Sequence, residues 1–208
     1  MLLLLGFLLS PKNASAPLKF EIFTWQRLWG VLIALLLQNI VVLRAFLCHR
    51  ESLKMNESPI HFSHSDILAA MPQQPPFLFV EEADYADGVI AGRYTLKPDE
   101  FFFKGHFKDN PVFPGTLMLE AMGQLCVFGL IKGVFADMPK PADPEKIFFT
   151  SGDGARCMRI CRPNEVLELR AKPTRIRRPI ANFEASMSVG GQKASFCEKL
   201  TLTFDFIS

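Results

Sequence analysis

The segment from Leu117 to Phe135 limits how this chain can fold more than any other, because it is apolar on nearly every side. A helix with one apolar stripe lies on a surface, whereas a helix that is apolar all round is enclosed by other elements. Pro114 can begin such a helix at its first position, and Gly133 or Pro139 can end it. The sequence therefore predicts one long helix wrapped by the rest of the domain.

The C-terminal third predicts antiparallel strands. Apolar and polar residues alternate in 180–189, the pair Gly190-Gly191 then predicts a hairpin turn, and residues 165–172 alternate in the same way. The returning strand is expected to fill one face, with Glu198 as its only exception, using Ala194, Phe196, Leu200, Leu202, Phe204 and Phe206. Strands with one apolar face belong to an antiparallel sheet with one solvated face. We therefore expect an α+β fold in which a curved antiparallel sheet wraps a central helix.

The segment before the long helix predicts three more elements. Residues 64–71 read as a short helix capped by Ser65 or Asp66. Residues 77–83 then predict a first strand, and residues 89–97 a second one after a turn at Asp87-Gly88.

The first 54 residues differ from the rest. Residues 28–43 form an apolar run between Arg27 and Arg44, which as a helix spans about 24 Å, against roughly 30 Å of bilayer hydrocarbon. This leader is a short membrane anchor, an amphipathic segment or translated upstream sequence with the true start at Met55, and we favour the last. We expect one domain over 55–208 in the cytoplasm, with membrane contact through 28–43 as the alternative.

Composition excludes some classes of function. The net charge of +2 does not favour nucleic-acid binding. The five cysteines lack the spacing of a disulfide framework and predict reduced thiols. Cys157 and Cys161 have no second Cys/His pair to complete a metal site, so we expect no metal.

A histidine and a glutamate stand out at the start of the long helix. Glu120 lies inside the apolar segment, and Gln124 shares its face four residues on. Burial disfavours the charged form of a carboxyl group, so Glu120 suits a general acid, with His106 as the matching base. The helix start at Pro114-Gly115 offers a backbone N–H that can polarise a carbonyl. These parts can remove a proton next to a thioester and expel a hydroxyl group.

The stretch "GHFKDNPVFPGTLMLEAMGQ" resembles the active-site signature of FabZ-type 3-hydroxyacyl-acyl carrier protein dehydratases. The residues in register are Gly105, His106, Phe107, Pro111, Val112, Pro114, Gly115, Leu117, Glu120, Ala121 and Gln124. Weaker similarity extends over roughly residues 63–206. Glutamate at 120, rather than aspartate, favours the FabZ type over the FabA type.

The resemblance implies a hotdog fold and the dehydration of (3R)-3-hydroxyacyl chains on acyl carrier protein, without metal or organic cofactor. His106 would be the base and Glu120 the acid. The Gly115 N–H would hold the thioester carbonyl, Gln124 would orient Glu120, and Phe107 and Pro114 would contact the substrate. The family builds each site at a dimer interface, which implies a homodimer and permits a hexamer.

Departures from the family pattern fall beside the base, where Lys108-Asp109 replaces the usual Pro-Gly, and at Gln73-Gln74, which replaces His-Arg.

Arg156, Arg159 and Arg162 belong to a basic cluster. The cluster is interpreted either as a solvated sheet face or as a docking surface for an acidic carrier protein. Two other functions stay open. One is a hotdog thioesterase, and the other is a non-catalytic subunit that binds acyl chains.

Overall fold

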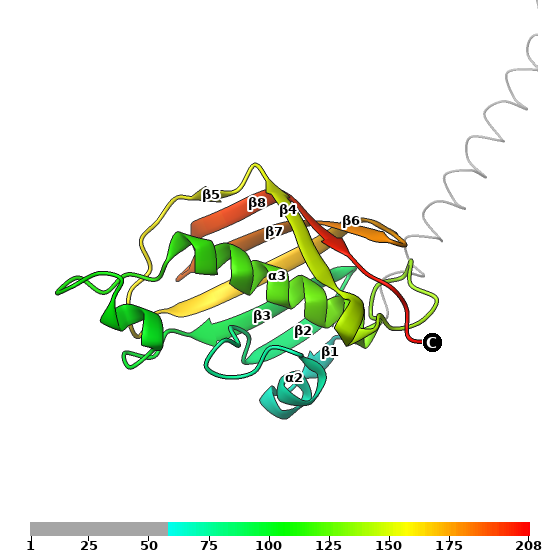
Figure 1. The fold of residues 1–208 in the computed structure, drawn as a ribbon, viewed down its shortest axis with the longest axis horizontal. Helices are drawn as coiled ribbons and strands as arrows, with labels where there is room; N and C mark the ends of the chain where they lie inside the picture. The colour runs from blue at the N-terminus through cyan, green and yellow to red at the C-terminus, as the bar shows by residue number, and fades with distance from the viewer. Residues whose placement is uncertain (1–57) are drawn as a thin grey trace, which may run out of the picture. The chain divides into compact units, whose positions relative to one another are not determined.

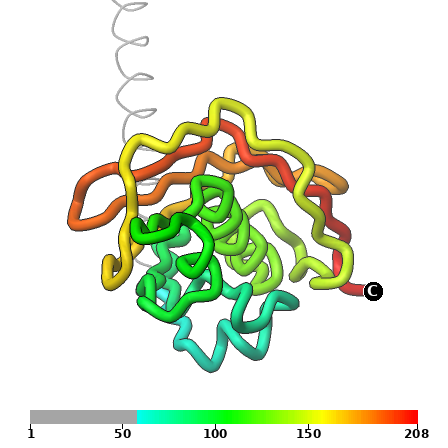
Figure 2. The backbone as a smooth tube through the Cα atoms, turned by 60° about the vertical axis from the view of Figure 1, so that its left-hand side comes forward, coloured from blue at the N-terminus to red at the C-terminus, as the bar shows by residue number. Residues whose placement is uncertain are grey.

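The computed structural model describes residues 58–208, and the predictions for the leader lie outside these residues. A single antiparallel sheet curves around one long helix, α3 (Gly115–Lys132), which lies in its concave side (Figures 1 and 2). The path through the sheet is β1-β2-β3-β6-β7-β8-β4, and β5 pairs with β8. The strands are β1 (Ile60–Phe62), β2 (Glu82–Ala86), β3 (Val89–Thr95), β4 (Phe148–Asp153), β5 (Arg156–Cys157), β6 (Val166–Arg177), β7 (Ile180–Val189) and β8 (Gln192–Thr203). The wrapped α+β hotdog architecture is confirmed.

The helix α3 forms the centre of the core. Twelve of its 18 residues are buried. It is long and apolar enough to cross a membrane, but 67% of it is buried inside the protein, as expected for a core helix. Gly133 ends it in a left-handed conformation at φ 63°, which glycine adopts without strain. Pro114 is the N-cap and Gly115 the first helical residue, one position later than predicted.

Three shorter helical elements complete the described chain: α2 (His64–Ala70), η1 (Phe101–Lys104) and η2 (Pro144–Lys146). The cap of α2 is Ser63, so the prediction of Ser65 or Asp66 was wrong. Asp66 instead takes the third helical position of a capping box, accepting from the Ser63 backbone while Ser63 accepts from the Asp66 N–H.

The predicted hairpins are present. Asp87 and Gly88 connect β2 to β3 with φ values of 52° and 75°, and Gly190-Gly191 connects β7 to β8. The alternation of β7 is confirmed, because its odd-numbered residues are buried against the core. The four cysteines in the described residues are free, as predicted.

Two strand predictions need correction. Residues 77–81 form no strand, because the Phe77 carbonyl and the Phe79 N–H bond to the side chain of Gln124 rather than to a neighbouring strand. On β8 a register shift adds one residue between the partners of Phe183 and Ala185. This bulge at Glu198-Lys199 places Cys197 on the core face and turns Phe196 to the outer face, where it was not expected.

Candidate functional site

The His106 imidazole is fixed by the backbone of its own loop. Its Nδ1 lies 2.9 Å from the carbonyl oxygen of Val112, and the Val112 N–H donates to the His106 carbonyl at 2.8 Å. A carbonyl can only accept, so Nδ1 carries the hydrogen and Nε2 keeps its lone pair. The half-buried ring also stacks on Phe107, with ring centres 3.9 Å apart. The arrangement leaves Nε2 as the ring nitrogen that is not bound to the backbone and is available to a substrate.

The η1 turn and the Cys161 backbone hold this loop at its ends. The N–H groups of Gly105 and His106 donate to the Phe102 carbonyl, the last turn of η1. Tyr94 donates a hydrogen bond to Glu100, the N-cap residue of η1. At the other end Phe113 donates to the Cys161 carbonyl at 2.8 Å. Burial raises the pKa of Tyr94 and the bond to Glu100 raises it further, so this phenol stays a donor at every physiological pH.

Gln124 holds the Glu120 carboxyl group. Its Nε2 donates to Glu120 Oε1 at 2.8 Å and to the Phe77 carbonyl at 3.0 Å, while its Oε1 accepts from the Phe79 N–H at 2.7 Å. The two backbone partners fix which end of the amide is oxygen, so Glu120 Oε1 must accept. The other oxygen, Oε2, is then the one that can carry a proton. Gln124 is 1% exposed, and burial strengthens this network.

Glu120 lines a cavity of about 220 Å³ on one side of α3. The cavity is lined by polar residues and by apolar side chains of α3, β4, β8 and the end of η2. Its lining residues are Gln73, Thr116, Leu119, Glu120, Gly123, Gln124, Val127, Ile147, Phe149 and Leu202. Glu120 is half-buried rather than fully buried, because it faces this space. His106 does not line the cavity. Within one chain, the candidate acid Glu120 and the candidate base His106 therefore do not share a cavity.

The first turn of α3 offers backbone donors. The first N–H groups of a helix have no partner within it, and the N-cap Pro114 has no N–H of its own. A Cβ at Gly115 would lie 2.9 Å from the Cys157 Sγ, so a larger residue here must displace that thiol or the helix start. The predicted oxyanion donor is therefore at a helix N-terminus that a side chain cannot cover.

The three arginines predicted as a carrier surface differ in their contacts. Arg159 forms a two-point pair with Glu165, with N···O distances of 2.7 and 3.0 Å. Arg162 donates to Asn110 Oδ1 at 2.9 Å. Arg156 is exposed in β5 and makes no side-chain ion pair within residues 58–208.

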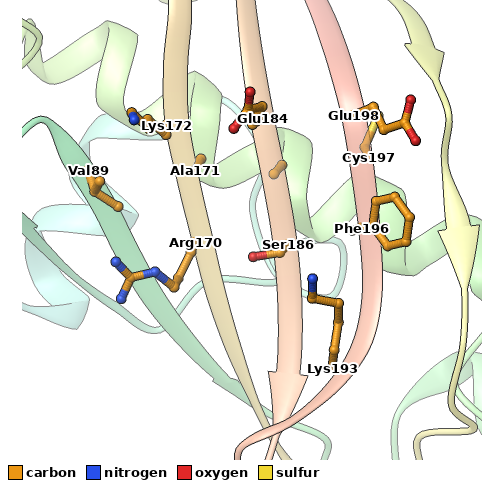
Figure 3. Close-up of a pocket in the computed structure, with 11 residues that line it drawn as sticks. Val89, Arg170, Ala171, Lys172, Glu184, Ser186, Lys193, Phe196, Cys197 and Glu198 are labelled. Atoms are coloured by element: carbon orange, nitrogen blue, oxygen red, sulfur yellow. The ribbon is translucent and has the colours of Figure 1, made fainter.

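A larger hollow, about 360 Å³, lies on the outer face of β3, β6, β7 and β8 (Figure 3). Charged side chains of both signs line it, among them Arg170, Lys172, Glu184, Lys193 and Glu198. It contains neither His106 nor Glu120, and the sheet separates it from α3. Residues 58–208 hold no cluster of three or more His, Cys, Asp or Glu side chains that suits a metal ion.

Contacts that depend on chain folding were missed from the sequence. The Val112 carbonyl bonds to His106, the backbone of Phe77 and Phe79 bonds to Gln124, and Asn110 bonds to Arg162. Backbone groups carry no signal in the sequence. Asn110 lies 52 residues from Arg162, so only the fold reveals their contact.

Comparison with known proteins adds independent information. The model of the FabA-like domain family matches residues 75–197. The 3-hydroxyacyl-[acyl-carrier-protein] dehydratase FabZ of Chloroflexus aggregans is 35% identical over 146 residues, which cover 69% of this chain and 96% of that protein. The protein of the same name from Lactococcus lactis subsp. cremoris is 35% identical over 147 residues, covering 70% and 95%.

The solved dehydratase heterocomplex ApeI:P from Xenorhabdus doucetiae has a TM-score of 0.56 to this chain, at 18% sequence identity. The match covers 67% of this chain and 90% of that one. At this identity the likeness concerns the fold.

Proposed function

This chain belongs to the FabA-like family as a FabZ-type 3-hydroxyacyl-acyl carrier protein dehydratase, and on that premise we propose how its residues remove water from the substrate. The substrate is a (3R)-3-hydroxyacyl chain held as a thioester on acyl carrier protein, and the product is the trans-2-enoyl thioester. The reaction serves fatty acid biosynthesis. The observation that carries the assignment is the held pair of groups: a His106 with a free Nε2 and a Glu120 anchored through one oxygen.

The proposed mechanism uses general base and general acid catalysis. Nε2 of His106 takes a proton from the carbon next to the thioester carbonyl, and the electron pair forms the new carbon–carbon double bond. The bond to the 3-hydroxyl oxygen breaks as Glu120 Oε2 donates its proton, so the hydroxyl leaves as water. The Gly115 N–H stabilises the negative charge on the thioester oxygen during the proton transfer. Return of the proton from His106 to Glu120 restores the enzyme.

A homodimer supplies the missing partner for each group. Since Glu120 lines a cavity without His106, we propose that His106 of one subunit faces Glu120 of the other. The sheet edge formed by β4 and β5 supports a dimer, because an edge strand leaves backbone N–H and C=O groups available to pair with another chain. The residues along it are apolar and 54–63% exposed: Phe148, Phe149, Met158 and Ile160. Burying such side chains favours association. On the ground of the family resemblance, we also propose that such dimers can assemble into a hexamer.

Acyl carrier protein is proposed to dock near Arg156. Arg156 lies on the strand next to Cys157, whose Sγ contacts Gly115 at the start of α3. A free guanidinium suits an acidic carrier surface better than one that is already paired, so Arg159 and Arg162 would contribute less. Charge reversal by Arg156→Glu should raise KM for carrier-bound substrate and leave KM for a pantetheine thioester unchanged. An equal change for both substrates would argue against this docking site.

The deciding experiment incubates protein beginning at Met55 with 3-hydroxyacyl carriers of several chain lengths. Loss of one water mass and appearance of the enoyl product are followed by mass spectrometry. His106→Ala and Glu120→Gln should each lower the rate by about 100-fold or more, since a general acid or base contributes 10²–10⁴-fold. Gel filtration checks that both variants stay dimeric. Full activity in either variant would refute the assigned roles.

The same assay separates the alternatives. A thioesterase would release free carrier thiol with the 3-hydroxy acid, and a binding subunit would change neither chain nor thioester. A cytoplasmic location and a start at Met55 remain proposals, and detergent partitioning of the full-length chain tests the membrane alternative.

A further inference from the structure

The loop that carries His106 closes on itself as a tight hairpin. Phe107 donates to the Asn110 carbonyl and Asn110 donates to the Phe107 carbonyl, both at 3.1 Å. Asp109 in the turn between them has a φ of 59°, in the left-handed region that aspartate tolerates. This turn holds Lys108-Asp109, the pair that departs from the family pattern. Because Phe107 stacks on the His106 ring, the position of the hairpin also sets the position of the imidazole.

A second segment holds this hairpin at both ends. At its base, Phe113 donates to the Cys161 carbonyl. At its tip, Arg162 Nη1 donates to Asn110 Oδ1 at 2.9 Å. These two contacts come from adjacent residues of the segment between β5 and β6, and they fall on either side of the His106–Val112 bonds.

The Arg162 end of this contact is itself anchored. The Arg162 N–H donates to Glu165 Oε2 at 2.8 Å, and Glu165 is held by two hydrogen bonds from the Arg159 guanidinium. A salt bridge thus shapes the segment from which Arg162 reaches the loop. The tip of the loop, residues 107–110, is exposed, so core packing does not hold it.

We infer that Arg162 is a positioning residue for the proposed dehydration: through Asn110 it fixes the hairpin that aims His106 at the substrate. Neither side chain needs to touch the substrate. A base that is misplaced by about 1 Å costs up to about 100-fold in rate, whereas an exposed hydrogen bond contributes little to overall stability. The contact should therefore matter more for turnover than for folding.

The test separates positioning from carrier binding, because Arg162 was also a candidate carrier contact. Arg162→Ala is assayed with a carrier-bound 3-hydroxyacyl substrate and with the matching pantetheine thioester. If Arg162 positions the loop, kcat falls about 10-fold for both substrates and KM stays within about 2-fold. If Arg162 binds the carrier, KM rises for the carrier substrate alone, and the inference is overturned.

Asn110 supplies the second arm. Asn110→Ala should reproduce the loss, and the double variant should be no slower than either single one, because the two changes break one contact. Asn110→Asp keeps an acceptor for Arg162 and should retain activity near the wild-type value. Additive losses, or a loss with Asn110→Asp equal to that with Asn110→Ala, would contradict the inference.

Arg178→Ala is the matched control, because it removes an exposed arginine hydrogen-bonded to Asp205 at a different place. It should leave kcat unchanged. If Arg162→Ala does not fold, Arg162→Met carries the same test, because methionine keeps much of the aliphatic side chain but has no N–H donor for Asn110. The inference rests on the proposed function, but its failure is distinct: inactive wild-type protein refutes the function, whereas active wild type with unaffected Arg162 and Asn110 variants refutes only the positioning role.

Discussion

Gln124 and Glu120 are joined by a 2.8 Å hydrogen bond one turn apart on α3, and the same glutamine amide also bonds to the backbone of Phe77 and Phe79. A single buried amide therefore ties the proposed acid to the segment that covers the helix. We therefore expect Gln124 to affect both the free energy of unfolding and the rate of dehydration.

Gln124→Leu should lower both quantities. It leaves the Phe79 N–H and the Phe77 carbonyl without their partner, at a cost of about 1–3 kcal/mol each. It also removes the hydrogen bond that holds Glu120, so kcat should fall about 10-fold or more but stay measurable. Urea unfolding and steady-state kinetics measure the two effects.

Gln74→Leu is the control for that experiment. Gln74 Nε2 also donates to two backbone carbonyls, those of Leu68 and Met71, but the residue is exposed and does not line the Glu120 cavity. Its kcat should equal the wild-type value. A Gln124 variant with normal turnover would show that Glu120 needs no such support.

Mixing two inactive variants should restore activity. If each site takes His106 from one subunit and Glu120 from the other, a heterodimer of His106→Ala with Glu120→Gln contains one intact site. Random exchange of equal amounts then regenerates roughly one quarter of wild-type sites in a two-fold symmetric dimer. The mixture is denatured, refolded together and assayed for enoyl formation.

The control refolds each variant alone. Activity in the mixture that stays at the level of the separate variants would mean that each chain builds its own site.

Gly115→Ala should reduce dehydration through a steric conflict. The new Cβ would lie 2.9 Å from the Cys157 Sγ and must displace the thiol or the helix start. We expect kcat to fall about 10-fold, because the oxyanion donor would shift. The kcat of the purified variant checks this expectation.

Adding Cys157→Ala to Gly115→Ala removes the conflicting sulfur and should recover most of the rate. Cys157→Ala alone should be close to wild type. If the double variant is as slow as Gly115→Ala, the clash with Cys157 is not the cause.

The salt bridge between Arg159 and Glu165 should make stability depend on acid pH. The Arg159 hydrogen bonds hold the pKa of Glu165 below its ordinary value of 4.5. A lowered pKa in the folded state adds stability above the unfolded value, and this contribution is lost as pH falls through the folded value. Glu165→Gln should therefore be less stable than wild type at pH 7, and the gap should narrow as pH falls below 4.5 and through the lowered pKa of Glu165.

Urea unfolding at pH 7 and at pH 3 measures that gap. Arg159→Gln removes the other partner and should show the same closing of the gap. A difference between wild type and Glu165→Gln that is constant with pH would mean that packing, not charge, accounts for it.

Local patterns in the sequence determined the architecture. The all-round apolar segment that became α3, the alternation of β7 and the turns at Asp87-Gly88 and Gly190-Gly191 each specify their element through short-range chemistry. The motif around His106 and Glu120 likewise identified the family, because its residues match the family signature in both type and spacing.

Tertiary structure decided how these parts meet. The bulge that turns Phe196 outward arises from strand pairing. Residues 77–81 form no strand, and Gln124 bonds the Phe77 carbonyl and the Phe79 N–H in place of a neighbouring strand. The contact between Arg162 and Asn110, and the absence of His106 from the Glu120 cavity, join or separate residues far apart in the sequence. Such contacts form only in the folded chain. They cannot be predicted from the sequence, because the sequence does not specify which backbone groups meet or which way each side chain points.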